Sequence, residues 1–238
     1  MTEDALFPVE LVQPQGSHSG PRLVAPGAVH VPGWLTDEQQ RWIVARFGEW
    51  TQGPVPLRAA TLPGGQQMSV KTVCLGWHWQ PYKYTREATD VNGRPVLDFP
   101  GWMVRLGKKA VSEAYAPELV QDASLSGLAD GYAPDAALVN FYGDGAAMGM
   151  HQDKDERSSA PVVSISIGDS CVFRFGNTRT RTKPYEDVQL RSGDLFVFGG
   201  PSRFAYHGIP KVHPGTAPSD CGLSHGRINI TMRVTGMS

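Results

Sequence analysis

The chain has 238 residues, of which 40% are hydrophobic and 19% charged, so we expect one domain over residues 1–238 with a large core. The formal net charge is −1. This balance excludes a strongly basic nucleic-acid-binding protein, and any contact with nucleic acid has to come from a local patch.

The first part of the chain predicts an extended arm followed by a helix. Residues 1–35 are rich in Pro, Gly and Ser, which favours an arm that lies over a core. Thr36 is a candidate N-cap with Gln39 three residues later, the capping-box pattern at the start of a helix. Apolar side chains then recur at helical spacing, at Trp42, Ile43, Phe47 and Trp50.

The next segment predicts a strand, an aromatic stretch and a second helix. Residues 68–77 are β-branched and apolar, and the aromatic run WHWQPYKY extends beyond them. Amphipathic spacing over residues 99–110 favours a helix despite Gly107. We therefore expect residues 36–115 to carry the helices of the fold.

From residue 137 onward the pattern changes to short strands. The strand-like runs are ALVNFY, PVVSISI, CVFRF, DVQL, DLFVF and RINITMRV, and glycine-rich turns divide them. Together with 27 Gly and 19 Pro, this rhythm is typical of an antiparallel sandwich or barrel. We expect an α+β, mainly β fold in which N-terminal helices cover a jelly-roll core over residues 135–235.

A metal site is indicated by His151 and Asp153 in HQDKDE and by His207 in YHGI. By itself an HxD pattern is common in polar surface turns, and a lone histidine is more often a core residue. Together, two imidazoles and one carboxylate are the ligand set that holds Fe(II) with open positions for a cosubstrate and O₂. Zinc in a hydrolase is an alternative occupant of the same ligands.

The last strand predicts an anion site. Alternation along RINITMR places four polar side chains on one face, namely Arg227, Asn229, Thr231 and Arg233. An edge strand with a solvated basic face would give the same pattern. However, Asn140 and Tyr142 add polar groups to another apolar strand. Two guanidinium groups with amide and phenol donors suit the two carboxylates of 2-oxoglutarate.

The order of these motifs resembles the AlkB family of Fe(II)- and 2-oxoglutarate-dependent nucleic-acid dealkylases. The motifs are NFY, HQDKDE, the strand pair ending in FGN, SGDLFVFGGPSRFAYHGI and RINITMR, preceded by MSVKTVCLGW and YKYT. They cover about residues 60–235. The resemblance implies a double-stranded β-helix core, with nucleotide recognition in the region of residues 36–115.

The same resemblance implies roles for the cofactor-binding side chains. Fe(II) would be held by His151, Asp153 and His207. 2-Oxoglutarate would be bound at its distal carboxylate by Arg227 and near the metal by Arg233. Further contacts would come from Asn140, Tyr142 and Asn229.

For the substrate, the resemblance implies a flipped base held between Trp77 and His151. Asp155 would contact the exocyclic amine of the base. The remaining contacts would come from Tyr82 and Tyr84 near the nucleotide backbone, and from Arg179 or Arg181, although the basic stretch FGNTRTRTKP also suits a solvated hairpin.

The activity implied by the family is oxidative demethylation of 1-methyladenine or 3-methylcytosine in single- or double-stranded DNA, with RNA left open. The reaction would use Fe(II) as cofactor, consume 2-oxoglutarate and O₂, and release succinate, CO₂ and formaldehyde. A related oxygenase that acts on a small molecule or a protein would carry the same cofactor residues. A catalytically silent β-sandwich binding module is a further alternative.

The cysteines and the N-terminal residues favour a cytoplasmic location. Cys74, Cys171 and Cys221 are odd in number and widely spaced, which predicts reduced thiols. MTEDALFPVE lacks a basic leader, and the sequence contains no apolar run of membrane-spanning length. We therefore expect a monomeric cytoplasmic protein that does not bind membranes.

Overall fold

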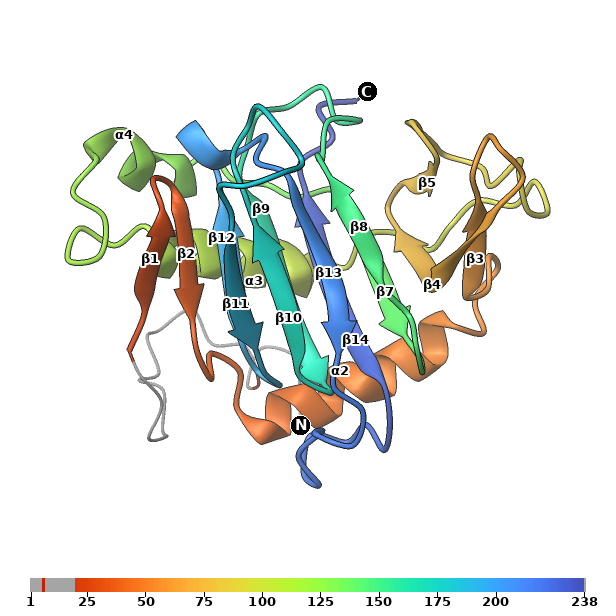
Figure 1. Cartoon of the computed structure of the whole chain (residues 1–238). Helices are drawn as coiled ribbons and strands as arrows, with labels where there is room; N and C mark the ends of the chain where they lie inside the picture. Colours follow the sequence, from red (N-terminus) through yellow and green to blue (C-terminus); the bar gives the residue numbers. More distant parts are fainter. Residues whose placement is uncertain (1–5, 7–19, 238) are drawn as a thin grey trace.

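The computed structural model describes residue 6 and residues 20–237, and within them two antiparallel sheets face each other (Figure 1). The larger sheet has the order β1 (Arg22–Ala25), β2 (Ala28–Val31), β12 (Leu195–Phe198), β9 (Val162–Gly168), β14 (Arg227–Arg233), β7 (Ala136–Tyr142), β4 (Gln67–Leu75) and β3 (Arg58–Thr61). The smaller sheet has the order β11 (Glu186–Leu190), β10 (Cys171–Phe175), β13 (His207–Val212) and β8 (Met148–His151). This arrangement confirms the expected mainly β fold with a jelly-roll core.

Side-chain alternation divides the interior into two cores. In β14, Ile228 and Ile230 belong to the core on the helical side of the larger sheet. In β12, Phe196 and Phe198 belong to the core between the two sheets, whereas Val197 belongs to the core on the helical side. The polar residues of β14 consequently face the space between the sheets, as the period of two predicts.

Two long helices cover the outer face of the larger sheet (Figure 1). Helix α2 (Asp37–Trp50) begins at the expected capping box, because Oγ1 of Thr36 accepts from the Gln39 amide at 3.3 Å and Oε1 of Gln39 accepts from the Thr36 amide at 2.9 Å. Helix α3 (Gly101–Ala114) packs so closely on Pro134 that Gly107 is favoured, since a Cβ there would lie 2.9 Å from the proline ring. The short helical turns are α4 (Ala123–Ser126), η1 (Gly127–Ala129) and η2 (Gly200–Ser202).

The expected N-terminal arm is only partly within the described residues. Residues 1–5 and 7–19 lie outside them. Strands β1 and β2 form a hairpin, and β2 pairs with β12 from Ala28 to Val31. All four residues of β2 are buried, so this part of the segment extends the larger sheet instead of lying over it.

A second hairpin forms a small sheet of its own, separate from the two larger sheets. It consists of β5 (His78–Gln80) and β6 (Lys83–Thr85), which pair only with each other among the described strands. We call residues 78–85 the recognition hairpin. It follows β4 directly and carries the aromatic run that the sequence placed after the strand.

Candidate active site

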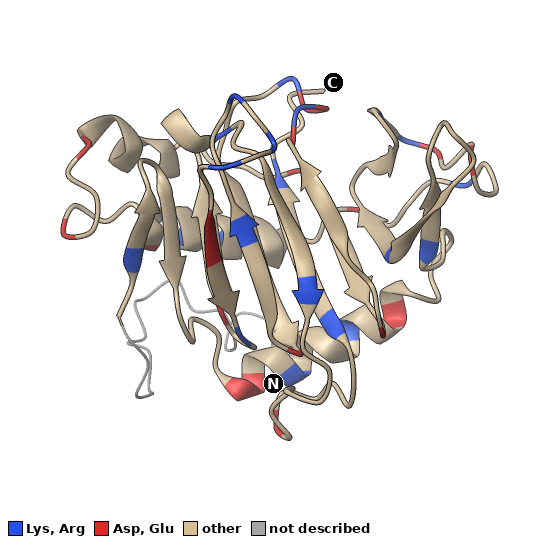
Figure 2. Cartoon of the chain, viewed as in Figure 1, with Lys and Arg blue, Asp and Glu red and all other residues tan. Residues whose placement is uncertain are grey.

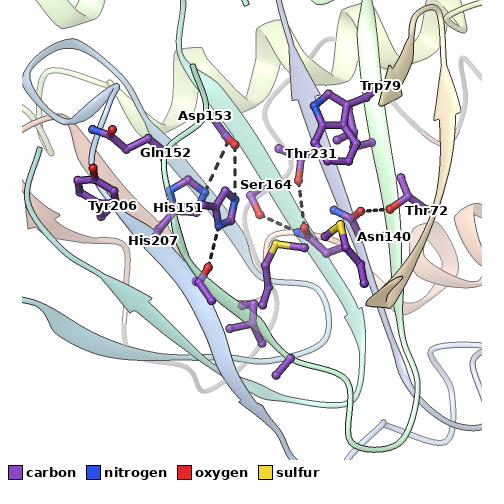
Figure 3. Close-up of a pocket in the computed structure, with 18 of the residues that line it drawn as sticks. Thr72, Trp79, Asn140, His151, Gln152, Asp153, Ser164, Tyr206, His207 and Thr231 are labelled. Atoms are coloured by element: carbon purple, nitrogen blue, oxygen red, sulfur yellow. Dashed lines mark hydrogen bonds and ion pairs between the residues drawn. The ribbon is translucent and has the colours of Figure 1, made fainter. Parts of the chain in front are cut away.

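Two histidines face each other on adjacent strands. His151 ends β8 and His207 begins β13, and the two are register partners with ring centroids 4.5 Å apart. Asp153 follows where the chain has left β8, with its carboxylate oxygens 3.6 Å from Nε2 of His151 and 3.7 Å from Nε2 of His207 (Figure 3). One ligand atom from each residue lies within 4.8 Å of the others. Strand pairing therefore assembles the predicted metal triad.

Backbone carbonyls set the tautomer of both imidazoles. Nδ1 of His151 lies 3.0 Å from the carbonyl oxygen of Gly149, and Nδ1 of His207 lies 3.0 Å from that of Ala205. Each Nδ1–H donates to its carbonyl, which leaves the lone pair on Nε2, the atom that faces Asp153. Both rings are thus oriented as metal ligands.

The charge state of the triad also suits a cation. Burial opposes ionisation of Asp153, but Arg233, His207 and His151 together hold the pKa of this carboxyl well below its usual range. Burial and the neighbouring His151 lower the pKa of His207 to about 4, so this imidazole is neutral at pH 7. Oδ2 of Asp153 is buried without a hydrogen-bond partner among the described residues. An orphaned carboxylate oxygen beside neutral imidazoles fits a divalent metal.

Arg227 provides a buried cation deeper in the site. Its Nη2 donates to Oγ of Ser166 at 2.9 Å, whereas Nε and Nη1 have no partner in the described part of the chain. Its guanidinium carbon lies 5.1 Å from the ring centre of Tyr142. Burial, above all, raises the pKa of Tyr142 to about 12, so the phenol remains a donor. These free donors suit a carboxylate of 2-oxoglutarate.

A row of hydrogen-bonded polar groups lies beside the metal triad (Figure 3). Oγ1 of Thr72 donates to Oδ1 of Asn140 at 2.7 Å. Nδ2 of Asn229 donates to Oγ of Ser164 at 2.8 Å, and Oγ1 of Thr231 donates to Oδ1 of Asn229 at 3.0 Å. The amides are therefore held in defined orientations.

All five predicted cosubstrate residues line one cavity of about 480 Å³ with the metal triad. They are Asn140, Tyr142, Arg227, Asn229 and Arg233. The size lies within the range of small-molecule sites, and the lining combines apolar walls with a few convergent polar groups.

The mouth of this cavity carries aromatic and charged side chains. Trp79 of β5 donates from Nε1 to Oδ2 of Asp155 at 2.9 Å, and both line the cavity. Tyr82 at the hairpin turn is 69% exposed and is the one non-glycine residue with positive φ among those described. Arg181 also lines the cavity, and its guanidinium carbon lies 5.8 Å from the ring centre of Tyr206.

Three expected substrate residues lie elsewhere. Trp77 is 5% exposed, packs in a hydrophobic cluster with Tyr84 and donates to Asp135 at 3.1 Å. Gly76 turns the chain with φ 77°, so Trp77 lies before β5 and turns away from the cavity, which Trp79 lines instead. Tyr84 is a buried residue of β6, and neither it nor the exposed Arg179 lines the described cavity.

Several site residues were missed from the sequence. Glu156 lies inside HQDKDE and Arg203 inside GGPSRF, yet neither motif signals that the two side chains form a buried ion pair at 3.0 Å. Ser164 and Ser166 alternate on β9 opposite the polar face of β14. The two serines could have been found from the sequence, because polar residues alternate with apolar ones in β9 as they do in the neighbouring strand β14.

Comparison with known proteins assigns the family. Residues 27–233 match the family described as the 2OG-Fe(II) oxygenase superfamily. The chain is 37% identical to the alpha-ketoglutarate-dependent dioxygenase AlkB of Escherichia coli over 76% of this chain and 78% of that protein. The chain belongs to the AlkB family of this superfamily. Membership implies Fe(II), 2-oxoglutarate and O₂, which match the triad and the arginine pair.

Other AlkB-family relatives extend this result. The chain is 32% identical to the DNA N(6)-methyladenine demethylase ALKBH1D of Arabidopsis thaliana over 94% of its own length, but it spans 52% of that protein. The chain thus spans about half the length of ALKBH1D and of ALKBH1C from the same plant. A solved structure of OsALKBH1 has a TM-score of 0.77 and 31% identity, and the match covers 90% of this chain and 100% of that one.

Two further expectations concern the cysteines and the membrane. Cys74, Cys171 and Cys221 are all buried free thiols. In the described part of the chain, no helix is both long enough and apolar enough to cross a membrane.

Proposed function

We propose that this AlkB-family chain oxidatively demethylates N-alkylated bases in nucleic acid, with 1-methyladenine and 3-methylcytosine in DNA as the preferred substrates. The observation that carries the proposal is the pairing of Trp79 with Asp155 at the mouth of the cavity that holds the metal triad. The name of the ALKBH1D relative, a DNA N(6)-methyladenine demethylase, supports a nucleic-acid substrate.

The base would enter between Trp79 and His151. An indole face stacks on any extruded base and interacts most strongly with a cationic one. The carboxylate of Asp155 adds an attraction for the positive charge of 1-methyladenine or 3-methylcytosine. Trp79 therefore takes the stacking role that the sequence suggested for Trp77.

The cosubstrate would lie along the polar row below the base. The unpartnered Nε and Nη1 of Arg227 would bind its distal carboxylate, and Arg233 would approach the carboxylate nearer the metal. Iron held by the triad supplies the oxidising chemistry when bound. One oxygen atom of O₂ enters succinate as 2-oxoglutarate loses CO₂, and the other hydroxylates the N-methyl carbon. The hydroxymethyl group then loses its hydroxyl proton and leaves as formaldehyde, and the electron pair of the broken C–N bond returns to the ring nitrogen, which gives the neutral, unmodified base.

The chain's own contribution is placement and protection. Arg227 and Arg233 orient the cosubstrate, Trp79 and Asp155 orient the base, and the stacked base closes the mouth of the cavity against water. The exposed basic loop at residues 176–185, with blue positions at the top of Figure 2, supports a phosphate contact at Arg181. All these groups come from one chain, which supports action as a monomer, and we propose a cytoplasmic location.

The test is a matched panel of oligonucleotides. Single- and double-stranded DNA and RNA would each carry 1-methyladenine, 3-methylcytosine or N6-methyladenine, and formaldehyde and succinate release would be measured with Fe(II). We expect stoichiometric formaldehyde from the two cationic lesions, fastest in single-stranded DNA because unstacking costs least there. Succinate release without base demethylation on every oligonucleotide would refute the proposal and indicate a small-molecule or protein substrate.

A further inference from the structure

Glu156 is a fully buried carboxylate three residues after the metal ligand Asp153. Its side chain has 0% exposure, which a glutamate tolerates only with strong partners. Oε1 accepts from the hydroxyl of Tyr84 at 2.7 Å and from Nη1 of Arg233 at 3.1 Å. Oε2 accepts from Nη2 of Arg203 at 3.0 Å. Glu156 therefore balances two buried cations at once.

Both of these arginines also bind the metal ligand. Nη2 of Arg233 lies 2.9 Å from Oδ1 of Asp153, and Nη1 of Arg203 donates to the main-chain oxygen of Asp153 at 2.7 Å. Arg203 is further held by the carbonyl of Ala160, to which its Nε donates at 2.7 Å. Glu156 is thus connected to the side chain of Asp153 through one arginine and to its backbone through the other.

Tyr84 brings the recognition hairpin into this network. It lies on β6 and is 6% exposed, and its hydroxyl donates to Glu156 while accepting from Nη1 of Arg233 at 2.8 Å. Burial, above all, raises the pKa of Tyr84 well above its ordinary value, so the hydroxyl keeps its proton. The element that carries Trp79 and Tyr82 is therefore anchored to the groups around Asp153.

We propose that Tyr84 and Glu156 are positioning residues for the metal and cosubstrate. They hold Arg233 and, through both arginines, keep Asp153 in place for the metal. Arg233 retains a buried Nε without a partner in the described residues, which leaves this donor for 2-oxoglutarate. Tyr84 connects the recognition hairpin to the metal site and does not touch nucleic acid. The inference rests on the family's cofactors and is independent of the proposed nucleic-acid substrate.

The experiment uses Tyr84→Phe and Glu156→Gln in the full chain. Both changes preserve shape: Tyr84→Phe removes the hydroxyl, and Glu156→Gln removes the charge and replaces one acceptor oxygen with an NH2 group. Tyr115→Phe is the matched control, because Tyr115 is also buried and its hydroxyl donates to the Gly27 carbonyl at 2.9 Å, outside the residues that line the site. Calorimetry would measure Mn(II) affinity and then 2-oxoglutarate affinity of the Mn(II)-loaded protein, with no oligonucleotide present.

We expect Tyr84→Phe and Glu156→Gln each to weaken 2-oxoglutarate binding about tenfold, and Mn(II) binding several-fold, as expected for the loss of a charge-assisted hydrogen bond. Tyr115→Phe should lower the melting temperature but change neither affinity. Unchanged affinities in folded Tyr84→Phe protein would overturn the proposal, whether or not Glu156→Gln folds. A separate titration of Tyr84→Phe with a labelled oligonucleotide completes the test, because weakened oligonucleotide binding with unchanged 2-oxoglutarate binding would also overturn the proposal and restore a direct nucleotide contact.

Discussion

The indole Nε1 of Trp79 donates to Oδ2 of Asp155 at 2.9 Å, so an aromatic face and a carboxylate are held together at the entrance to the metal site. Trp79 belongs to the recognition hairpin, whereas Asp155 belongs to the loop after β8. The two sides of the entrance are therefore coupled by one hydrogen bond. We expect this pair to select the substrate.

Removing the indole tests the stacking role. Trp79→Ala should weaken binding of a 1-methyladenine oligonucleotide by about 10- to 100-fold, because stacking a base on an aromatic ring contributes about 1–3 kcal/mol. Affinity for 2-oxoglutarate should stay unchanged. Fluorescence anisotropy with a labelled strand would measure this loss. Trp77→Phe is the comparison, and a larger loss of oligonucleotide affinity there than in Trp79→Ala would contradict the assignment.

Charge selectivity is tested by Asp155→Asn. The amide oxygen of asparagine still accepts from Trp79, so only the negative charge is removed. We expect kcat/KM to fall about tenfold for 1-methyladenine, the size of one charge-assisted interaction, and to fall less for the neutral N6-methyladenine. Parallel turnover assays on the two lesions check this. Equal losses on both would show that charge does not determine the preference.

The cosubstrate site predicts a specific effect of Arg227→Lys. Lysine keeps the positive charge but cannot bind a carboxylate through two parallel hydrogen bonds. The KM for 2-oxoglutarate should rise by about 10- to 100-fold, whereas Mn(II) affinity should change little. Arg174→Lys is a control, since Arg174 pairs with Asp187 at 2.8 Å on the outside of the small sheet. An unchanged KM in Arg227→Lys would argue against this residue as the carboxylate ligand.

The metal-free protein should lose stability on acidification. The folded pKa of His207 is about 4, below the value of an unfolded histidine near 6.5, so the unfolded state binds the proton first as the pH falls. Stability is therefore lost between about pH 6.5 and pH 4, by an amount of the order of 3 kcal/mol. Urea unfolding in chelator at pH 7 and pH 4.5 measures this loss. His207→Asn should show a smaller difference, and an identical one would assign the effect to other groups.

The basic loop predicts a salt-dependent contact. Arg181→Ala should weaken oligonucleotide binding and reduce the slope of log affinity against log salt by about 0.7, the value for one phosphate contact on a single strand. Binding titrations from low to moderate salt determine this slope. Arg179→Ala is the neighbouring control, because Arg179 is exposed but does not line the described cavity. If Arg179→Ala has the larger effect, the phosphate contact belongs to that arginine.

The sequence by itself determined the groups whose placement depends on local periodicity. The polar face of β14 follows from alternation along one strand, and both Arg227 and Arg233 line the cavity as predicted. The histidines were identifiable because only certain side chains ligate iron, and strand pairing then brought His151 and His207 into register. Residue type and a period of two are properties of a short segment, so one chain is enough to read them.

Only the tertiary structure decided which aromatic residue faces the cavity and what supports the metal site. A positive φ at Gly76 turns Trp77 into a hydrophobic cluster, and Trp79 takes its place. Tyr84 meets Glu156, 72 positions later in the chain, and Glu156 meets Arg203 a further 47 positions on. Such contacts depend on how distant segments pack and on the need of a buried charge for a partner, and neither is encoded in the spacing of residues along the chain.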